Sequence, residues 1–326
     1  MTRPIIPPPV FGRPPVARGL FATTPPAIFP PVLGLFGLGL AWRRGAEMLG
    51  LPIGVSEMVL GAVSLLYLFA LVAYLSKVMR RPAVLAEDLD ILPGRAGVVA
   101  ASLSMTLLAA ALVPYAPGLA FGLGVLGLCT HLVLAVWAVW YFLTCAPEKR
   151  VVTPVWHLIF VGFILGGLVW EPLGVTWLVW VIVAVTIPAA LVIWATSAVQ
   201  FIRRVPPAPL RPLLAIHLAP ASLFATVLTD LGQTGFGAAF AGLALVILAV
   251  LSVSGRWLTE TGFSPMWGAF TFPVAACASA VLVQGWDVPG AIVLLGATIV
   301  VVSIAVRVMQ AWVRGDLAAK TNSAVA

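Results

Sequence analysis

Charged residues are scarce in this 326-residue sequence. Only 9% of its residues are Asp, Glu, Lys or Arg, against roughly 25% in a typical soluble domain. So few charges cannot cover the surface of a water-soluble protein of this size. Hydrophobic residues make up 62% of the chain, and they stand in continuous runs of helix length, not in the alternation of barrel strands. The sequence therefore predicts an all-α integral membrane protein.

Cysteine and histidine are also scarce, with three residues of each. The cysteines form no CxxC pair, and we interpret them as small packing residues: Cys129, Cys145 and Cys277. The histidines fall on three different apolar runs, without HxxxH or HxxH spacing: His131, His157 and His217. A metal site needs several converging ligands, so we expect neither a metal nor a cofactor.

Sequence motifs of catalysis are missing as well. The chain has no Walker A motif, no GxGxxG fingerprint and no recognisable Ser/His/Asp arrangement. Its one acidic cluster, Glu87, Asp88 and Asp90, resembles half of the paired aspartate-rich sites of membrane prenyltransferases, and we interpret it as a solvated loop. We therefore expect no enzyme activity, and a membrane enzyme or assembly factor without a pore is the weakest hypothesis.

Apolar runs near the 20 residues that a helix needs to cross the hydrocarbon core are abundant. Between breakers and charges the sequence contains ten of them: Ile28–Met48, Val55–Val78, Gly97–Val113, Leu119–Leu143, Val155–Trp170, Thr176–Val199, Pro212–Leu228, Gly235–Val253, Pro265–Val283 and Pro289–Val313. This predicts a ten-helix transmembrane domain over 27–314. A basic, proline-rich arm (1–26), unlike a signal peptide, precedes it, and a short tail (315–326) follows.

The basic residues are unevenly distributed among the connections. If the N-terminus is cytoplasmic, every Lys and Arg except Arg43 and Arg44 lies on the cytoplasmic side. This positive-inside pattern predicts that both termini are cytoplasmic, and it explains the net charge of +7 without a nucleic-acid partner. The preference for Arg over Lys and the abundant Ala, Val and Gly are typical of a GC-rich bacterium, so the expected location is a bacterial cytoplasmic membrane.

Odd-numbered and even-numbered runs differ in composition. Prolines fall mainly in odd runs, as at Pro154, Pro220 and Pro273, with Pro188 as the even-run exception. A proline inside a helix frees a carbonyl, which in a membrane must be satisfied by protein or by water in a cavity. We therefore expect five helical hairpins, with an inner ring of odd helices around a pore and an outer ring of bulkier even helices.

Four segments together resemble a known family. They read PPAIFPPVLGLFGLGLAWR (Pro25–Arg43), LPGRAGVVAASLSM (Leu92–Met105), LRPLLAIHLAPASL (Leu210–Leu223) and MWGAFTFPVAA (Met266–Ala276). In this order they resemble the TehA-type tellurite-resistance and dicarboxylate transporters, which include the plant slow-type anion channels. The resemblance implies a homotrimer with one pore in each protomer, lined by the five odd helices and plugged by a phenylalanine of the ninth.

The last of these segments supplies the candidate gate. It resembles the family's W-x-F/Y-x-F-P signature, which puts the plugging phenylalanine at Phe272, with Phe270 as the alternative. Pro273 and Pro220 are the candidate kinks of the pore-lining helices. His217, three residues before Pro220, is a candidate pore-facing residue, because ionisable side chains inside a membrane are functional candidates.

The two outer arginines allow two interpretations. Arg43 and Arg44 could form an outer vestibule that attracts anions. Alternatively they could be a neutralised helix end, because Glu47 follows one turn later and can pair with them.

No charged residue lies deep in the third, fifth, seventh or ninth run. Ion-coupled transporters usually carry buried carboxylates for the coupling ion, so their absence favours a channel or exporter for small inorganic or organic anions. The family resemblance suggests that this transport contributes to tellurite resistance. A coupled carrier of C4-dicarboxylates or oxyanions on the same fold is the alternative. The expected partners are these anions, the lipid bilayer and two further copies of the chain.

Overall fold

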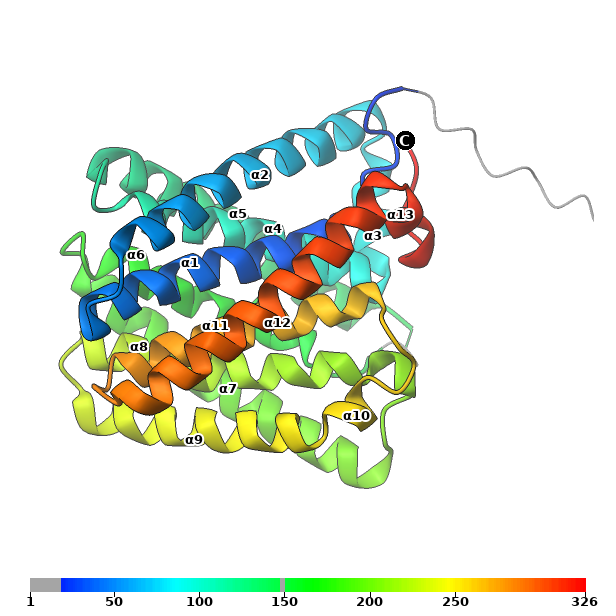
Figure 1. The fold of residues 1–326 in the computed structure, drawn as a ribbon. Helices are drawn as coiled ribbons and strands as arrows, with labels where there is room; N and C mark the ends of the chain where they lie inside the picture. The colour runs from blue at the N-terminus through cyan, green and yellow to red at the C-terminus, as the bar shows by residue number, and fades with distance from the viewer. Residues whose placement is uncertain (1–18, 147–149) are drawn as a thin grey trace, which may run out of the picture.

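The computed structural model describes residues 19–146 and 150–326, so most of the expected N-terminal arm lies outside the described residues. All secondary structure in the described part of the chain is helical. Figure 1 shows the long helices running side by side between two ends. The C-terminus, α3 and α13 lie at one end, which we name the terminal side, and the α1–α2 connection lies at the other, the distal side.

Nine helical segments in the described ranges are long and apolar enough to cross a membrane. They are α1 (Phe29–Leu49) after the turn η1 (Pro26–Ile28), α2 (Ile53–Arg80), α4 (Leu92–Leu112), α5 (Pro117–Thr144), α7 (Thr176–Arg203), η5 (Ala208–His217) with α8 (Leu218–Asp230), α9 (Thr234–Val253), η6 (Pro265–Trp267) with α11 (Gly268–Leu282), and α12 (Asp287–Val313). The multi-pass membrane prediction is thereby confirmed.

A tenth apolar segment is shorter, at His157–Trp170. It consists of η3 (His157–Val161), η4 (Gly162–Gly166) and α6 (Gly167–Trp170). Each predicted run falls on one of these ten segments, but the tenth does not have the length of a regular span, so the count of ten spans and their pairing into five hairpins stay predictions. The remaining helices are short: α3 (Ala83–Asp90), α10 (Gly255–Leu258) and α13 (Asp316–Lys320).

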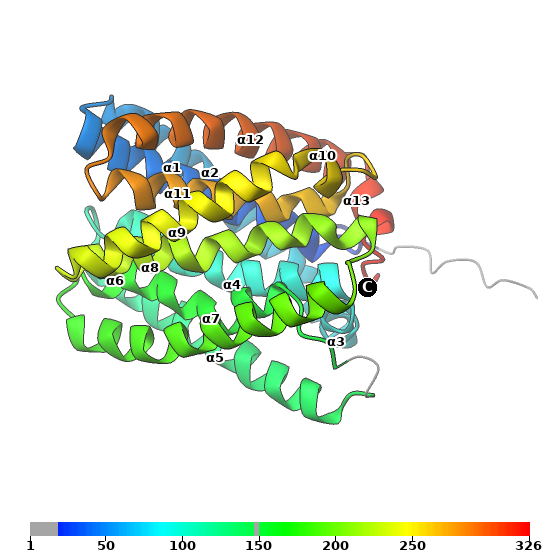
Figure 2. The same cartoon turned by 90° about the horizontal axis from the view of Figure 1, so that it is seen from below.

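Burial alternates along the chain. In their most apolar windows, 61–83% of the residues are buried in the segments that contain α1, α4, α8 and α11. The corresponding share is 17–33% in α2, α5, α7, α9 and α12. Of these, α2 and α9 lie at opposite edges of the bundle in Figure 1, and α12 lies at the edge opposite α5 and α7 in Figure 2. Because exposed apolar side chains suit contact with lipid, this difference agrees with the predicted division into inner and outer helices.

The buried segments are also the irregular ones. With the shorter segment His157–Trp170, which is also mostly buried, there are five buried segments. Four of the five contain 3-10 turns or a π-helical turn, and the first turn of three such stretches contains a proline: Pro26, Pro209 and Pro265. Proline suits the first turn because its missing N–H has no intrahelical acceptor there. The outer helices are continuous α-helices of 20–28 residues.

The interpretation of the acidic cluster as a solvated loop is wrong in two respects: the cluster is helical, and although Glu87 and Asp90 are exposed, Asp88 is not. The cluster belongs to α3, and Asp88 is fully buried, where it accepts hydrogen bonds from Lys77 Nζ at 2.8 Å and Tyr74 Oη at 3.1 Å. Lys77 lies inside α2 and is equally buried. The two charges are buried because they pair with each other. Ser323 and the Ala324 N–H also bind Asp88.

Candidate functional site

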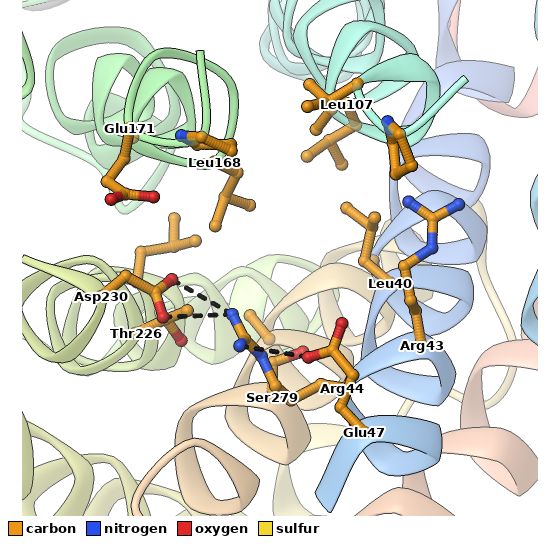
Figure 3. A pocket seen from close by; sticks show the side chains of 18 of the residues that line it. Leu40, Arg43, Arg44, Glu47, Leu107, Leu168, Glu171, Thr226, Asp230 and Ser279 are labelled. Carbon is orange, nitrogen blue, oxygen red and sulfur yellow. Dashed lines mark hydrogen bonds and ion pairs between the residues drawn. The ribbon is translucent and has the colours of Figure 1, made fainter. Parts of the chain in front are cut away.

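A cavity of about 310 Å³ lies among the buried segments on the distal side. Its wall comes from α1, α4, α6, α8 and α11, all of which belong to odd-numbered predicted runs. Each contributes at least one side chain visible in Figure 3: Leu40, Leu107, Leu168, Thr226 and Ser279. The five segments therefore converge on one space, mostly apolar, with charged groups toward its mouth.

Both outer arginines lie at this mouth, and both are paired. Arg44 Nη2 donates to the two carboxylate oxygens of Asp230 at 3.1 and 3.2 Å, and its Nη1 donates to Glu47 at 3.3 Å (Figure 3). Arg43 does not use Glu47; its Nε and Nη2 each donate to Glu57 of α2 at 3.0 Å. The ion pairs thus join α1 to α8 and α1 to α2.

The charges around the cavity almost balance. Its lining holds the two arginines and three carboxylates, from Glu47, Glu171 and Asp230. The electrostatic potential at the mouth is therefore not uniformly positive, and it depends on which ion pairs are formed. Next to it, in the turn after α4, a hydrogen bond to Glu57 raises the pKa of Tyr115 above its usual value.

Phe272 of α11 forms the floor of the cavity. The side chain is only 6% exposed, yet it also lines two smaller cavities, of about 40 Å³ and about 20 Å³. Among the described residues it is the only one that lines all three. Its ring therefore lies between the distal cavity and both smaller ones. Leu223 is the other described residue that lines both the distal cavity and the cavity of about 20 Å³.

The neighbours of Phe272 on α11 fit this position. Gly268, one turn earlier, lines the cavity of about 40 Å³, and Ala276, one turn later, lines the large distal cavity. Residues four apart share one helix face, so small residues flank the ring on that face. Phe270 lines none of the three cavities and instead meets the ring of Trp267 edge to face at 6.2 Å. Pro273 is buried next to the ring.

The fifth and seventh runs meet beside the smallest cavity. Pro220 lines it from the first turn of α8, directly after the 3-10 stretch η5 ends. His157 also lines it, whereas His217 is not part of its lining and instead places Nδ1 2.9 Å from Nε2 of His157. Sequence reasoning selected His217 and missed His157, because a contact between residues 60 positions apart leaves no local signal.

Within the described ranges, no three or more His, Cys, Asp and Glu side chains come together in a way that could hold a metal ion. The site thus consists of three cavities lined mostly by apolar side chains, one aromatic ring that borders all three, paired charges at the distal mouth and a histidine pair next to the smallest cavity.

Comparison with curated proteins gives no match. A comparison with protein families does: the family described as voltage-dependent anion channel, SLAC1, matches residues 23–313, a range that contains every segment of the site. This confirms the resemblance to TehA-type proteins and slow-type anion channels, a family of channels and transporters. The chain belongs to the voltage-dependent anion channel family.

Proposed function

We propose that the protein conducts small anions along the axis of the five buried segments, and that the Phe272 ring is the gate. One observation carries the proposal: the buried Phe272 ring borders the large distal cavity and both small cavities beyond it. Movement of that one side chain would join spaces that the rest of the chain already surrounds.

The proposed passage suits weak, rapid binding. Its wall at the ring consists of small and apolar side chains such as Gly37, Ala276 and Leu223. An apolar constriction blocks ions when it is narrow and dry, and it conducts when it widens and fills with water. Strong binding by fixed charge would slow release of the anion, so the absence of charged residues next to Phe272 in the described lining favours conduction.

The orientation and assembly are parts of the same proposal. The positive-inside pattern places the terminal side in the cytoplasm and the paired arginines on the outer face of a bacterial inner membrane. Proline-containing turns at Pro220 and Pro273 position the helices around the ring. A homotrimer with one pore in each protomer follows from the family resemblance.

A coupled carrier is the second candidate function. The distal cavity, at about 310 Å³, has room for a C4-dicarboxylate or an oxyanion such as tellurite, and Arg43 and Arg44 line it. Guanidinium groups bind carboxylates in two-point geometry, provided that the substrate replaces Asp230 or Glu57 as partner.

Purified protein in planar bilayers separates the two functions. A channel predicts anion-selective currents whose reversal potential follows the anion gradient, with chloride, nitrate and malate tested in turn. A carrier predicts saturable, gradient-driven uptake into vesicles with little or no current. Cation-selective currents, or neither current nor uptake, would contradict the proposed function.

A further inference from the structure

A buried histidine pair lies beyond Phe272, toward the terminal side. His157 is the first residue of η3 and His217 is the last residue of η5. His157 Nε2 and His217 Nδ1 are 2.9 Å apart, and the rings meet edge to face with centroids 5.0 Å apart. His157 is 2% exposed. Two histidines from distant segments thus share one hydrogen bond inside the bundle.

The hydrogen bonds of this pair are incomplete. Two neutral imidazoles share a single N–H between the facing nitrogens, and this accounts for His157 Nε2. The other ring nitrogen, His157 Nδ1, is buried and has no partner in the described part of the protein. A buried polar atom without a partner is costly and rare, so a molecule that is not part of the chain is expected to supply one.

A space for that molecule adjoins the ring. His157 lines the cavity of about 20 Å³ together with Phe272 and Pro220. A water-sized particle needs roughly 10–15 Å³ measured in this way, so the cavity has room for one. The same space borders the Phe272 ring, and therefore lies on the proposed route of the anion.

Other titratable groups near the pair are already engaged. Both ring nitrogens of His131 in α5 are hydrogen-bonded: Nε2 to the Ile159 carbonyl of η3, and Nδ1 to the Ser102 hydroxyl. Arg211 of η5 pairs with Glu260. The other charged groups on the packed elements are Arg95, whose guanidinium lies over two aromatic rings, and the exposed Arg203 at the end of α7. Arg256 of α10 is also exposed, and Asp230 at the end of α8 pairs with Arg44. None of these residues lines the small cavity.

We propose that this pair is a joint binding site for one proton and one small anion, located in the permeation path. The inference rests on the proposed function for its effect on conduction. The proton binds to His157 Nδ1, so that this ring carries two N–H groups. Nε2–H then donates to His217 Nδ1, and Nδ1–H donates to a chloride-sized anion in the cavity. No covalent bond is made or broken, and both the proton and the anion leave unchanged.

Proton and anion must assist each other at such a site. An imidazolium buried in an apolar bundle is unfavourable unless an opposite charge accompanies it. Binding of the anion therefore raises the affinity for the proton, and by linkage the proton raises the affinity for the anion by the same factor. Acidification on the terminal side should increase anion conductance severalfold, and a higher anion concentration should move the midpoint of that response to higher pH.

The test measures conductance of the whole protein in bilayers while the pH on the terminal side is lowered from about 8 to about 5, the range of histidine titration. Wild type should show the increase, and raising chloride should shift its midpoint upward. His157→Gln and His217→Gln should each remove the pH response. His131→Gln is the matched control, because it changes a third buried histidine that lies off the small cavity, and it should keep the response.

Three results would overturn the inference: a flat response in wild type, a response kept in both His157→Gln and His217→Gln, or equal loss in His131→Gln. Imidazole nitrogen NMR of wild type supplies a second readout that needs neither transport nor variants. A histidine titration that shifts with chloride supports the site, and one that is insensitive to chloride overturns it. A chloride-linked titration in a protein without current would support the site and contradict the proposed channel.

Discussion

At the scale of single residues, the Phe272 ring rests against the backbone of α1. A Cβ atom added to Gly37 would lie 2.9 Å from Cδ2 of Phe272 and 3.3 Å from Cβ of Ala275, closer than unstrained side chains pack. Glycine at 37 therefore sets how near α1 comes to the ring. Gly34, one turn earlier, fits in the same way against Thr271.

Gly37→Ala tests whether this contact positions the gate. The added methyl group pushes the ring away from α1 and further across the passage, so single-channel conductance should fall severalfold. In a Phe272→Ala background the same change should have little effect, because no ring remains to be displaced. A double-mutant cycle compares the change in conductance caused by Gly37→Ala in the wild-type and Phe272→Ala backgrounds. Equal changes in both would contradict the idea that residue 37 acts through the ring.

Arg44 and Asp230 form a pair whose two halves predict opposite effects. Arg44→Gln leaves the Asp230 carboxylate unneutralised at the distal mouth, so anion flux should fall. Asp230→Asn frees the guanidinium, so flux should rise. Both effects should be largest at low ionic strength, because salt screens the potential of partly exposed charges. If both variants lose flux equally at every salt concentration and unfold at lower temperature, the pair is only a structural clamp.

Which single residues could be selected from the sequence depended on the kind of signal. Phe272 could be selected because a local motif contains it. The partners Arg43–Glu57 and His157–His217 could not, since periodicity reports which face of a helix is apolar, and not which residue of another helix lies opposite. Even Glu47, correctly placed within reach of both arginines, binds only Arg44.

At the scale of elements, α2 and α3 are fastened together by buried charge on the terminal side. Lys77 Nζ also donates to the Thr24 carbonyl and to Ser323 Oγ, so both ends of the described chain bind the same ion pair. The residues before α1 and after α13 are thereby held together on the terminal side. An exposed pair on the same helices, Arg81–Glu87, provides a natural comparison.

Asp88→Asn should destabilise the protein by about 3–5 kcal/mol, because it leaves the buried Lys77 ammonium without its counter-charge. Combining it with Lys77→Met should recover much of that loss. Glu87→Gln, which breaks the exposed pair, should cost no more than about 1 kcal/mol. Thermal unfolding of the purified variants in detergent measures all three. Equal losses for Asp88→Asn and Glu87→Gln would show that the buried pair has no special role.

Helix existence was predictable, but helix type was not. The length of an apolar run determines whether a segment can cross the membrane, and each predicted run coincides with a helical segment. The π-helical turn at His157–Val161 and the long 3-10 stretch at Ala208–His217 depend on packing between segments far apart in sequence. The helix α3 was missed for a related reason: its eight residues become helical where Asp88 meets Lys77.

At the scale of the whole molecule, the order of buried and exposed segments is what makes a passage possible. Five buried segments, four of them irregular, surround the three cavities, and continuous apolar helices cover them. Composition could predict this division because lipid-facing helices need bulky apolar surface, whereas inner helices need close approach. It could not predict the paired charges of the distal mouth.

Membrane orientation is testable at this scale. Reporter tags inserted after Arg150 or Arg204 should be found in the cytoplasm, and tags near Glu171 or Asp287 outside it, because the basic connections remain inside. In the structure, Arg204 directly follows α7 and Asp287 is the first residue of α12, and these two helix ends lie at opposite ends of the bundle. Tags after Arg204 and near Asp287 reporting from one side would refute the orientation.

Conductance and thermal stability of Phe272→Ala, compared with Phe270→Ala, test the central claim most directly. Removing a fully packed phenylalanine costs on the order of 3–5 kcal/mol. Because the Phe272 ring borders three cavities, its loss should join them, raise anion conductance sharply and lower stability by less than that. Phe270→Ala should leave conductance unchanged and lower stability through the lost contact with Trp267. High conductance in Phe270→Ala, or a destabilised Phe272→Ala without increased conductance, would contradict the account.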